Sequence, residues 1–283
     1  MDQNPTTEQI DHLIESALQE DLGTGDITTR STVGENLIYE SEVVARGNMV
    51  VCGLEIFKLV FMRLDSGVTF SLQPLMDGNS ASAGDILLRL KGKATALLEG
   101  ERVALNILQR LSGIATLTRA FVDRAGAVEI LDTRKTTPGL RVFEKYAVRC
   151  GGGKNHRFGL FDTILIKDNH IKAAGGIASA VKRVRSKNGS GKSIEVETTN
   201  LGEVKEALDA DVDIIMLDNM GLDAILEAVR VIDGKAKIEV SGAVTLERLG
   251  PLSRTGIDCV SIGELTHSPQ AADISMNFVS LGS

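Results

Sequence analysis

The chain has 283 residues, of which 43% are hydrophobic and 24% charged. These values are ordinary for a globular protein and exclude a disordered chain. Its 31 Lys and Arg stand against 38 Asp and Glu, a formal charge of −7, and aromatic residues make up only 4%. A dedicated nucleic-acid binder is therefore not expected, and no apolar run reaches the roughly 18 residues that span a membrane.

The N-terminal residues and the cysteines indicate a cytoplasmic protein. Residues 1–9 are polar and lack the apolar core of a secretory signal. Cys52, Cys150 and Cys259 show no CxxC spacing and predict reduced thiols rather than disulfides or a zinc site. Cys150 lies six residues before His156 and is a candidate catalytic thiol, but a buried, unreactive thiol is the favoured interpretation.

The first part of the chain predicts mixed helices and strands. Apolar spacing predicts a helix over residues 10–18, which ends at the glycines that follow. A strand over 38–45, a helix over 54–64 and strands near 68 and over 86–90 come next. Residues 94–122 predict a long helical segment, with Gly113 as the point where it could break.

After residue 125 short apolar runs alternate with segments of helical spacing. Each run is followed by polar or glycine residues, and the runs are 128–131, 163–166, 194–196, 214–217, 238–240 and 260–262. This alternation is typical of a buried parallel sheet. An incomplete α/β barrel of six to seven strands is the favoured fold, and a doubly wound sheet is the alternative. In both folds ligands bind at the carboxyl ends of the strands.

A cationic segment follows the first two of these strands. Between residues 132 and 172 nine Lys and Arg stand against four Asp and Glu, and His156 and His170 lie there too. For Arg141, Lys145 and Arg149 a solvated helix face is the favoured interpretation. Cations that directly follow strands instead predict a pocket for carboxylates and phosphates.

Carboxylates and glycines follow the later strands. Glu197 and Asp218 end consecutive strands and could hold Mg²⁺ together with substrate phosphates, or form structural ion pairs with nearby lysines. Ser241, Gly242 and Gly263 follow the last two strands, which is the usual position of a phosphate in such barrels.

Several segments resemble the quinolinate phosphoribosyltransferase family, also called nicotinate-nucleotide pyrophosphorylase. The segments are EDLGTGDIT (20–28), ERVALN (101–106), DTRKTTPG (132–139), GGGKNHR (151–157), LIKDNH (165–170), EVE (195–197), LDN (217–219), LTHS (265–268) and DIS (273–275). They occur in order along nearly the whole chain, which makes the resemblance specific.

The resemblance implies an N-terminal α/β sandwich domain (residues 1–112, joined by the C-terminal tail 274–283) and an incomplete α/β barrel domain (113–273). It implies a homodimer that converts quinolinate and phosphoribosyl pyrophosphate to nicotinate mononucleotide, pyrophosphate and CO₂ in NAD biosynthesis, with Mg²⁺. The residues implied to bind quinolinate are Arg134, His156, Arg157 and, from the neighbouring subunit, Arg102. Those implied for phosphoribosyl pyrophosphate and its metal are Lys135, Lys167, Glu197, Asp218, Ser241, Gly242 and Gly263. Ala243 departs from the family, since many relatives have glycine there, and its Cβ narrows the phosphate loop.

Other functions remain open from the residues alone. A lysine that follows a strand, such as Lys135 or Lys167, could form a Schiff base in a lyase. A relative encoded with molybdate transport genes shares the fold, but the GGGKNHR segment favours the quinolinate enzyme. A non-enzymatic anion-binding protein would bind pyrophosphate without turnover.

Overall fold

The computed structural model describes residues 4–71, 75–188 and 191–279, which divide into two compact units. The sandwich unit takes its residues from 2–119, 137–152 and 268–283. The barrel unit takes most of its residues from 120–136 and 153–267. The chain therefore passes between the units several times.

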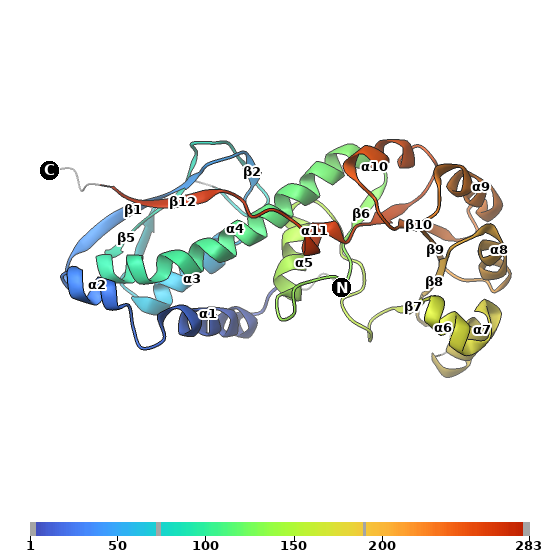
Figure 1. Ribbon diagram of the computed structural model, residues 1–283, viewed down its shortest axis with the longest axis horizontal. Coiled ribbons are helices and arrows are strands. Elements are labelled where there is room, and N and C mark those ends of the chain that lie inside the picture. The colour runs from blue at the N-terminus through green and yellow to red at the C-terminus, as the bar shows by residue number, and fades with distance from the viewer. Residues whose placement is uncertain (1–3, 72–74, 189–190, 280–283) are drawn as a thin grey trace. The chain divides into compact units, whose positions relative to one another are not determined.

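The sandwich unit contains a four-stranded antiparallel sheet of order β12-β1-β5-β3 (Figure 1). Its strands are β1 (Ile38–Ala45), β3 (Thr69–Ser71), β5 (Ile86–Lys93) and β12 (Ile274–Val279). β12 comes from the C-terminal end of the chain, and its Met276 lies opposite Val43 of β1. A separate two-stranded ladder joins β2 (Met49–Val50) to β4 (Ser80–Ala81). The strand predicted over 38–45 is confirmed.

Helices accompany this sheet, and their starts follow from local capping. α1 (Thr7–Leu22) begins with a capping box in which Thr6 and Gln9 exchange hydrogen bonds, and Asp26 caps α2 (Ile27–Thr32). α3 (Leu54–Leu64) has the bounds that the sequence predicts and buries Phe57 and Phe61 completely.

The longest helix is α4 (Ala94–Ala125), and it does not break at Gly113. A Cβ on Gly113 would lie 2.1 Å from the carbonyl oxygen of Gln270. The break considered for Gly113 is therefore wrong, because the glycine serves close packing of the helix against another segment rather than an end of the helix.

A solvated face for α5 (Arg141–Cys150) is also wrong. Lys145 is only 1% exposed, and Arg141 and Arg149 are only partly exposed. The neighbouring Glu144 is fully buried and accepts hydrogen bonds from Arg110 (2.8 Å) and from the hydroxyl of Thr137 (2.8 Å). Because buried charged groups need partners, α5 belongs to the packed interior of the sandwich unit.

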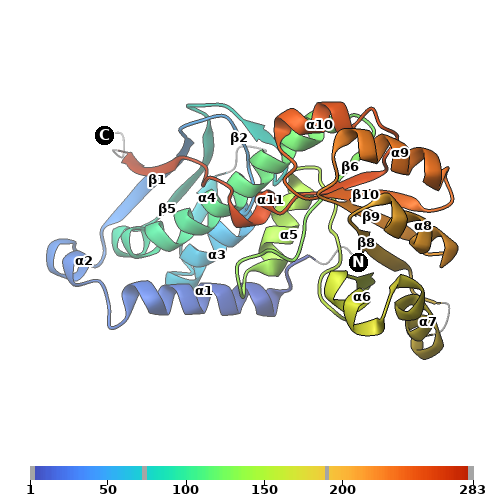
Figure 2. The same ribbon diagram turned by 45° about the vertical axis from the view of Figure 1, so that its right-hand side comes forward.

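The barrel unit is built on a six-stranded parallel sheet of order β6-β11-β10-β9-β8-β7 (Figure 2). Its strands are β6 (Glu129–Leu131), β7 (Ile164–Ile166), β8 (Ile194–Thr198), β9 (Ile214–Asp218), β10 (Lys237–Ser241) and β11 (Cys259–Ser261). Lys154 forms an isolated parallel bridge with Leu131 at the free edge of β6. All six predicted strands are confirmed, and the incomplete barrel is the observed fold.

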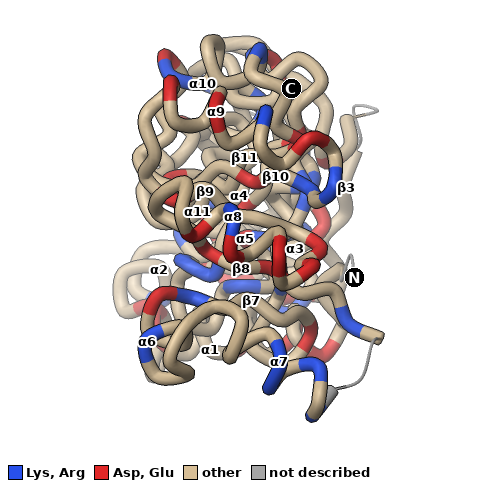
Figure 3. Tube along the Cα trace, turned by 90° about the vertical axis from the view of Figure 1, so that its right-hand side faces the viewer, with Lys and Arg blue, Asp and Glu red and all other residues tan. Residues whose placement is uncertain are grey.

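Helices alternate with these strands and cover the outside of the sheet (Figures 1 and 2). They are α6 (Asp168–Ala174), α7 (Ile177–Asn188), α8 (Leu201–Asp209), α9 (Leu222–Ile232), α10 (Leu246–Leu252) and α11 (Glu264–His267). Both signs of charge occur on α6, α9 and α10 (Figure 3). Among the described residues no helix is long and apolar enough to cross a membrane.

Candidate active site

A cavity of about 560 Å³ lies at the carboxyl ends of the barrel strands. Most of the residues that the sequence and the resemblance single out line it together: Arg134, Lys135, His156, Arg157, Lys167, Glu197, Asp218, Ser241 and Gly242. Ala243, which the resemblance places on the phosphate loop, also lines it, and so do Thr133, Asn219 and Ser261, which had not been predicted as site residues. Side chains that are far apart in sequence meet here because the carboxyl ends of parallel strands share one edge of the sheet.

The loop that carries His156 is anchored by a buried carboxylate. Asp132 directly follows β6 and has no exposed surface. It accepts hydrogen bonds from the side-chain amide of Asn155 (2.6 Å) and from the backbone N–H of His156 (2.8 Å). Charge-assisted bonds of this kind are stronger than neutral ones. Asp132 thereby fixes the path of the loop that brings His156 and Arg157 to the cavity.

Two buried carboxylates hold the ring of His156. Its Nε2 lies 3.2 Å from Glu195 on β8 and 3.5 Å from Glu239 on β10. Burial opposes the charge of the ring, but hydrogen bonds to Glu195 and Glu239 outweigh it and raise the pKa of His156 to about 10. The backbone N–H of Arg157 points at Nδ1 (2.7 Å), a contact that favours the neutral ring. The two buried negative charges are the stronger influence, so His156 is a cation at neutral pH.

The sequence alone did not identify Glu195 and Glu239 as part of the site. They are 1% and 2% exposed, and Oε1 of Glu239 has no hydrogen-bond partner among the described residues. Burial raises the pKa of Glu195 as well. A signal was present, because an acidic residue inside an otherwise apolar barrel strand must face a cation or another polar group.

Cations are crowded at this end of the cavity. Burial and the nearby charge of Arg134 both lower the pKa of Arg157. The guanidinium groups of Arg134 and Arg157 and the ring of His156 form a cluster of three positive charges on partly buried side chains. Such a cluster suits a ligand that carries two carboxylates.

Lys135 lies on a loop that packs against the turn after β11. The carbonyl of Lys135 accepts a hydrogen bond from the hydroxyl of Thr266 (2.9 Å). A Cβ on Gly263 would lie 3.0 Å from Cδ of Lys135, so Gly263 leaves room for the lysine stem. Gly263 therefore borders the site through Lys135, although it is not one of the residues lining the cavity.

The acidic part of the cavity contains Glu197 and Asp218. Glu197 forms an ion pair with Lys167 and is 12% exposed. Asp218 accepts a hydrogen bond from the side-chain amide of Asn219 (2.8 Å). The structural ion pair considered for these carboxylates is thus present at Glu197.

Two consecutive residues of the segment after β10 have a positive φ. Gly242 has a φ of +93°, and a Cβ there would lie 2.2 Å from Oδ1 of Asn219. Arg248 donates to the carbonyls of Gly242 (3.3 Å) and Ala243 (3.0 Å). Since a trans peptide points C=O and the following N–H in opposite directions, these contacts turn the N–H of Ala243 away from Arg248. Ala243 has a φ of +46°, which is strained for any residue with a Cβ.

Arg102 is not one of the residues that line this cavity. It is exposed on α4 and belongs to the sandwich unit.

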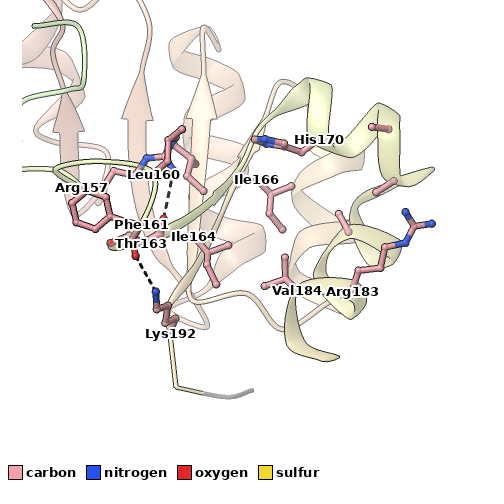
Figure 4. Close-up of a pocket in the computed structure, with 14 residues that line it drawn as sticks. Arg157, Leu160, Phe161, Thr163, Ile164, Ile166, His170, Arg183, Val184 and Lys192 are labelled. Carbon is pink, nitrogen blue, oxygen red and sulfur yellow. Dashed lines mark hydrogen bonds between the residues drawn. The ribbon is translucent and has the colours of Figure 1, made fainter. Parts of the chain in front are cut away.

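A second hollow of about 690 Å³ lies beside β7 and shares Arg157 and Leu165 with the first. Figure 4 shows its apolar floor, with Ile164, Ile166 and Val184, and Lys192 donating to the carbonyl of Phe161 (3.0 Å). Leu160 and Phe161 at its rim are 71% and 69% exposed.

The acidic residues present fit Mg²⁺ bound through a substrate. Mg²⁺ prefers oxygen ligands and is commonly held by one or two carboxylates together with substrate phosphates. Glu197 and Asp218 line one cavity with Ser241 and Gly242. Among the described residues, two groups of three side chains are close enough together to hold a metal ion: Cys52–Asp77–Cys150 in the sandwich unit, and His156–Glu195–Glu239, of which His156 lines this cavity.

The barrel and its charged cavity define a class: α/β-barrel enzymes that act on carboxylate and phosphate substrates at the ends of their strands. Two family models match the chain, the N-terminal domain of quinolinate phosphoribosyl transferase at residues 26–112 and its C-terminal domain at 114–277. The chain belongs to the quinolinate phosphoribosyltransferase family.

Individual relatives agree with the family models. The chain is 46% identical over 271 residues to a probable nicotinate-nucleotide pyrophosphorylase [carboxylating] of Bacillus subtilis, covering 95% of this chain and 93% of the relative. It is 41% identical to quinolinate phosphoribosyltransferase [decarboxylating] 1 of Nicotiana glauca, covering 93% and 81%. The solved structure of the nicotinate-nucleotide pyrophosphorylase from Francisella tularensis superposes with a TM-score of 0.92 at 39% identity and covers 97% of each chain.

Proposed function

We propose that the chain transfers the phosphoribosyl group of phosphoribosyl pyrophosphate to quinolinate with loss of CO₂, which gives nicotinate mononucleotide and pyrophosphate for NAD biosynthesis. The observation that carries this proposal is one cavity with two kinds of subsite. Arg134, His156 and Arg157 crowd three positive charges together, while Lys167, Glu197 and the Gly242 loop line the same cavity. The first group suits a dicarboxylate and the second a phosphorylated sugar.

The cationic cluster would hold quinolinate with its ring nitrogen directed at the sugar. The nitrogen attacks the anomeric carbon while the bond to pyrophosphate breaks, and positive charge develops on the ribose. Asp218 and Glu197 are the carboxylates that can stabilise this charge, and Lys135 and Lys167 are the cations that can take up charge on the leaving pyrophosphate. Mg²⁺ bound by Glu197 and Asp218 would neutralise the pyrophosphate further.

Loss of CO₂ follows from the same arrangement. After transfer the ring nitrogen is quaternary, so it stabilises the carbanion left when the adjacent 2-carboxylate leaves as CO₂. A proton then replaces the carboxylate on that carbon. No covalent enzyme intermediate is needed, since positioning and electrostatics are the tasks of the protein.

A test of acceptor choice follows from the three cations. Quinolinate and its monocarboxylate analogue nicotinate should be compared at saturating phosphoribosyl pyrophosphate and Mg²⁺. We expect pyrophosphate release with quinolinate and a kcat/KM at least 100-fold lower with nicotinate. Equal use of both would contradict the dicarboxylate subsite. Borohydride trapping tests the Schiff-base alternative, and an adduct on Lys135 or Lys167 would favour the lyase.

We also propose a homodimer in which Arg102 reaches the cavity of the neighbouring subunit. The exposed position of Arg102 on α4 leaves its guanidinium group accessible to a second copy. Mixing inactive Arg102→Ala and Lys167→Ala subunits should restore activity in the mixed dimer, where one of the two sites is intact. No recovery from mixed dimers verified by mass would contradict a shared site. A cytoplasmic location is part of the same proposal, and three free thiols favour it.

A further inference from the structure

Two cysteines about a hundred residues apart in sequence meet in the sandwich unit. Cys52 follows β2 and has no exposed surface, whereas Cys150 ends α5 and is partly exposed. The two sulfur atoms and a carboxylate oxygen of Asp77 lie within 4.8 Å of one another. Both thiols are free. The fold therefore creates a thiol pair that the sequence spacing does not reveal.

The neighbouring carboxylate is already engaged by protein donors. Asp77 accepts hydrogen bonds from the backbone N–H groups of Gly53 (2.9 Å) and Leu54 (3.1 Å), where it caps the start of α3. It also accepts one from the hydroxyl of Tyr146 (2.8 Å). Because both oxygens serve these donors, chemistry of the two sulfurs is a better match to the site than a metal held by all three side chains.

The pKa values of the two thiols are shifted in opposite directions. A hydrogen bond from Cys52 lowers the pKa of Cys150, burial and the charge of Asp77 oppose this, and the charge of Arg149 acts in the same direction as Cys52. The same hydrogen bond, together with burial, raises the pKa of Cys52 well above its ordinary value. Cys150 is therefore the thiol that ionises first, and Cys52 keeps its proton beside it.

We propose that Cys150 and Cys52 form a peroxide-sensitive pair in which Cys150 is oxidised first and Cys52 then closes a reversible disulfide. The thiolate of Cys150 attacks a hydroperoxide, the O–O bond breaks, and the released alkoxide takes a proton to become an alcohol. Cys150 is now a sulfenic acid. The sulfur of Cys52 attacks it, the S–O bond breaks, and hydroxide leaves as water with the proton of Cys52. Two thiols are oxidised to one disulfide and one hydroperoxide is reduced.

The end of α5 is held in place by close packing. Gly151 packs against α4 so tightly that a Cβ there would lie 2.5 Å from the carbonyl oxygen of Ala115. A disulfide needs an S–S distance of about 2.05 Å, so the side chains must approach by rotation while this packing holds the backbone. The cross-link would join the start of α3 to the residue directly before the glycines that lead to His156.

The test is oxidation of the purified full-length protein with hydrogen peroxide, followed by thiol counting after denaturation and by peptide mass mapping. We expect the three thiols to fall to one, with a Cys52–Cys150 linked peptide lighter by two hydrogen atoms, and full recovery with dithiothreitol. Cys259→Ser is the matched control and should form the same linked peptide. Cys52→Ser should stop at a sulfenic acid on Cys150 that dimedone traps, and Cys150→Ser should keep both of its thiols.

Other outcomes would overturn the pair. These are survival of all three thiols, oxidation mapped first to Cys259, or a disulfide found only between chains on a non-reducing gel. Tightly bound zinc in the purified protein that blocks both thiols until it is chelated would also overturn it. If a serine variant fails to fold by circular dichroism, the mapping of the wild-type protein alone decides.

Discussion

Asp132 provides the most direct test of how the fold builds the site. Its carboxylate is fully buried, and the hydrogen bonds that it accepts include one from the side chain of Asn155 at 2.6 Å and one from the backbone of His156 at 2.8 Å. Bonds to a charged group contribute about 1.5–3 kcal/mol each. Asp132→Ala removes both acceptors and leaves two donors without this partner, so we expect a combined cost of about 3–6 kcal/mol, shared between stability and catalysis.

The kinetic share can be measured separately from the stability share. If about 3 kcal/mol of this cost is lost from transition-state stabilisation, kcat/KM for quinolinate falls about 100-fold, since each 1.4 kcal/mol is a factor of ten. KM for phosphoribosyl pyrophosphate should change much less, because other loops line its part of the cavity. Asp132→Asn should show a smaller loss, since its one amide oxygen can still accept one of the two hydrogen bonds, although its NH₂ group then faces the other donor.

The assay is steady-state kinetics with each substrate varied in turn, together with thermal unfolding. Asp209→Asn, an exposed carboxylate on α8, is the matched control and should leave both readouts unchanged. A kcat/KM within threefold of wild type for Asp132→Ala, at an unchanged Tm, would show that Asp132 does not position the loop that carries His156. An equal rise in KM for both substrates would refute the specific link to His156.

Three further predictions concern other parts of the cavity. Lys135→Ala should lower kcat/KM by about 10- to 100-fold, because the lysine charge contributes about 1.5–3 kcal/mol to substrate binding, and should leave Tm unchanged, because the side chain is exposed. Lys182→Ala on α7 is the control, and equal kinetics of the two variants would contradict a role for Lys135. Ala243→Gly should raise Tm by about 1–4 °C because it relieves a φ of +46°, and a lower Tm would contradict this. The raised pKa of His156 means that its charge and stabilisation are complete below pH 6.5 and are lost as the pH rises through about 10. The KM for quinolinate should therefore stay constant from pH 7 to about 9 and rise at higher pH. Glu239→Gln removes one of the negative charges beside the ring and should move this rise to lower pH. A rise that is already complete by about pH 8 in the wild-type protein would contradict a charged His156 ring.

The strands and the mouth of the barrel could be predicted because their signals are local. Most of the apolar runs are followed within a few residues by side chains that line the cavity, such as Lys167 after β7 and Asp218 at the end of β9. Since parallel strands end at the same edge, the meeting of these residues follows from topology alone. The resemblance to a known family adds their roles, which the spacing does not contain.

What could not be predicted depends on contacts between distant segments. Glu195 and Glu239 meet below His156 only through the order of the strands. A glycine such as Gly113 is typical of a break in a helix, but here the close approach of Gln270 leaves no room for a larger side chain. Periodicity describes one element at a time and so carries no information on such contacts.

The two thiols and α5 show the same limit. Cys52 and Cys150 have no motif spacing, and only the packing of α5 brings them together. The charges of α5 look solvated in sequence, yet Lys145 is buried. The spacing of charges along a helix predicts which of its faces is polar, but it does not show whether another segment covers that face.

We have proposed that the cavity couples phosphoribosyl transfer to decarboxylation, and quinolinate labelled in the carboxylate that leaves tests this coupling. Purified protein is incubated with phosphoribosyl pyrophosphate, Mg²⁺ and quinolinate labelled with ¹³C in the 2-carboxylate. Nicotinate mononucleotide, pyrophosphate and labelled CO₂ are then quantified in the same sample. We predict that all three form in equal amounts and that none forms when either substrate is omitted. Release of pyrophosphate without labelled CO₂, or no nicotinate mononucleotide at all, would contradict the coupling of transfer to decarboxylation.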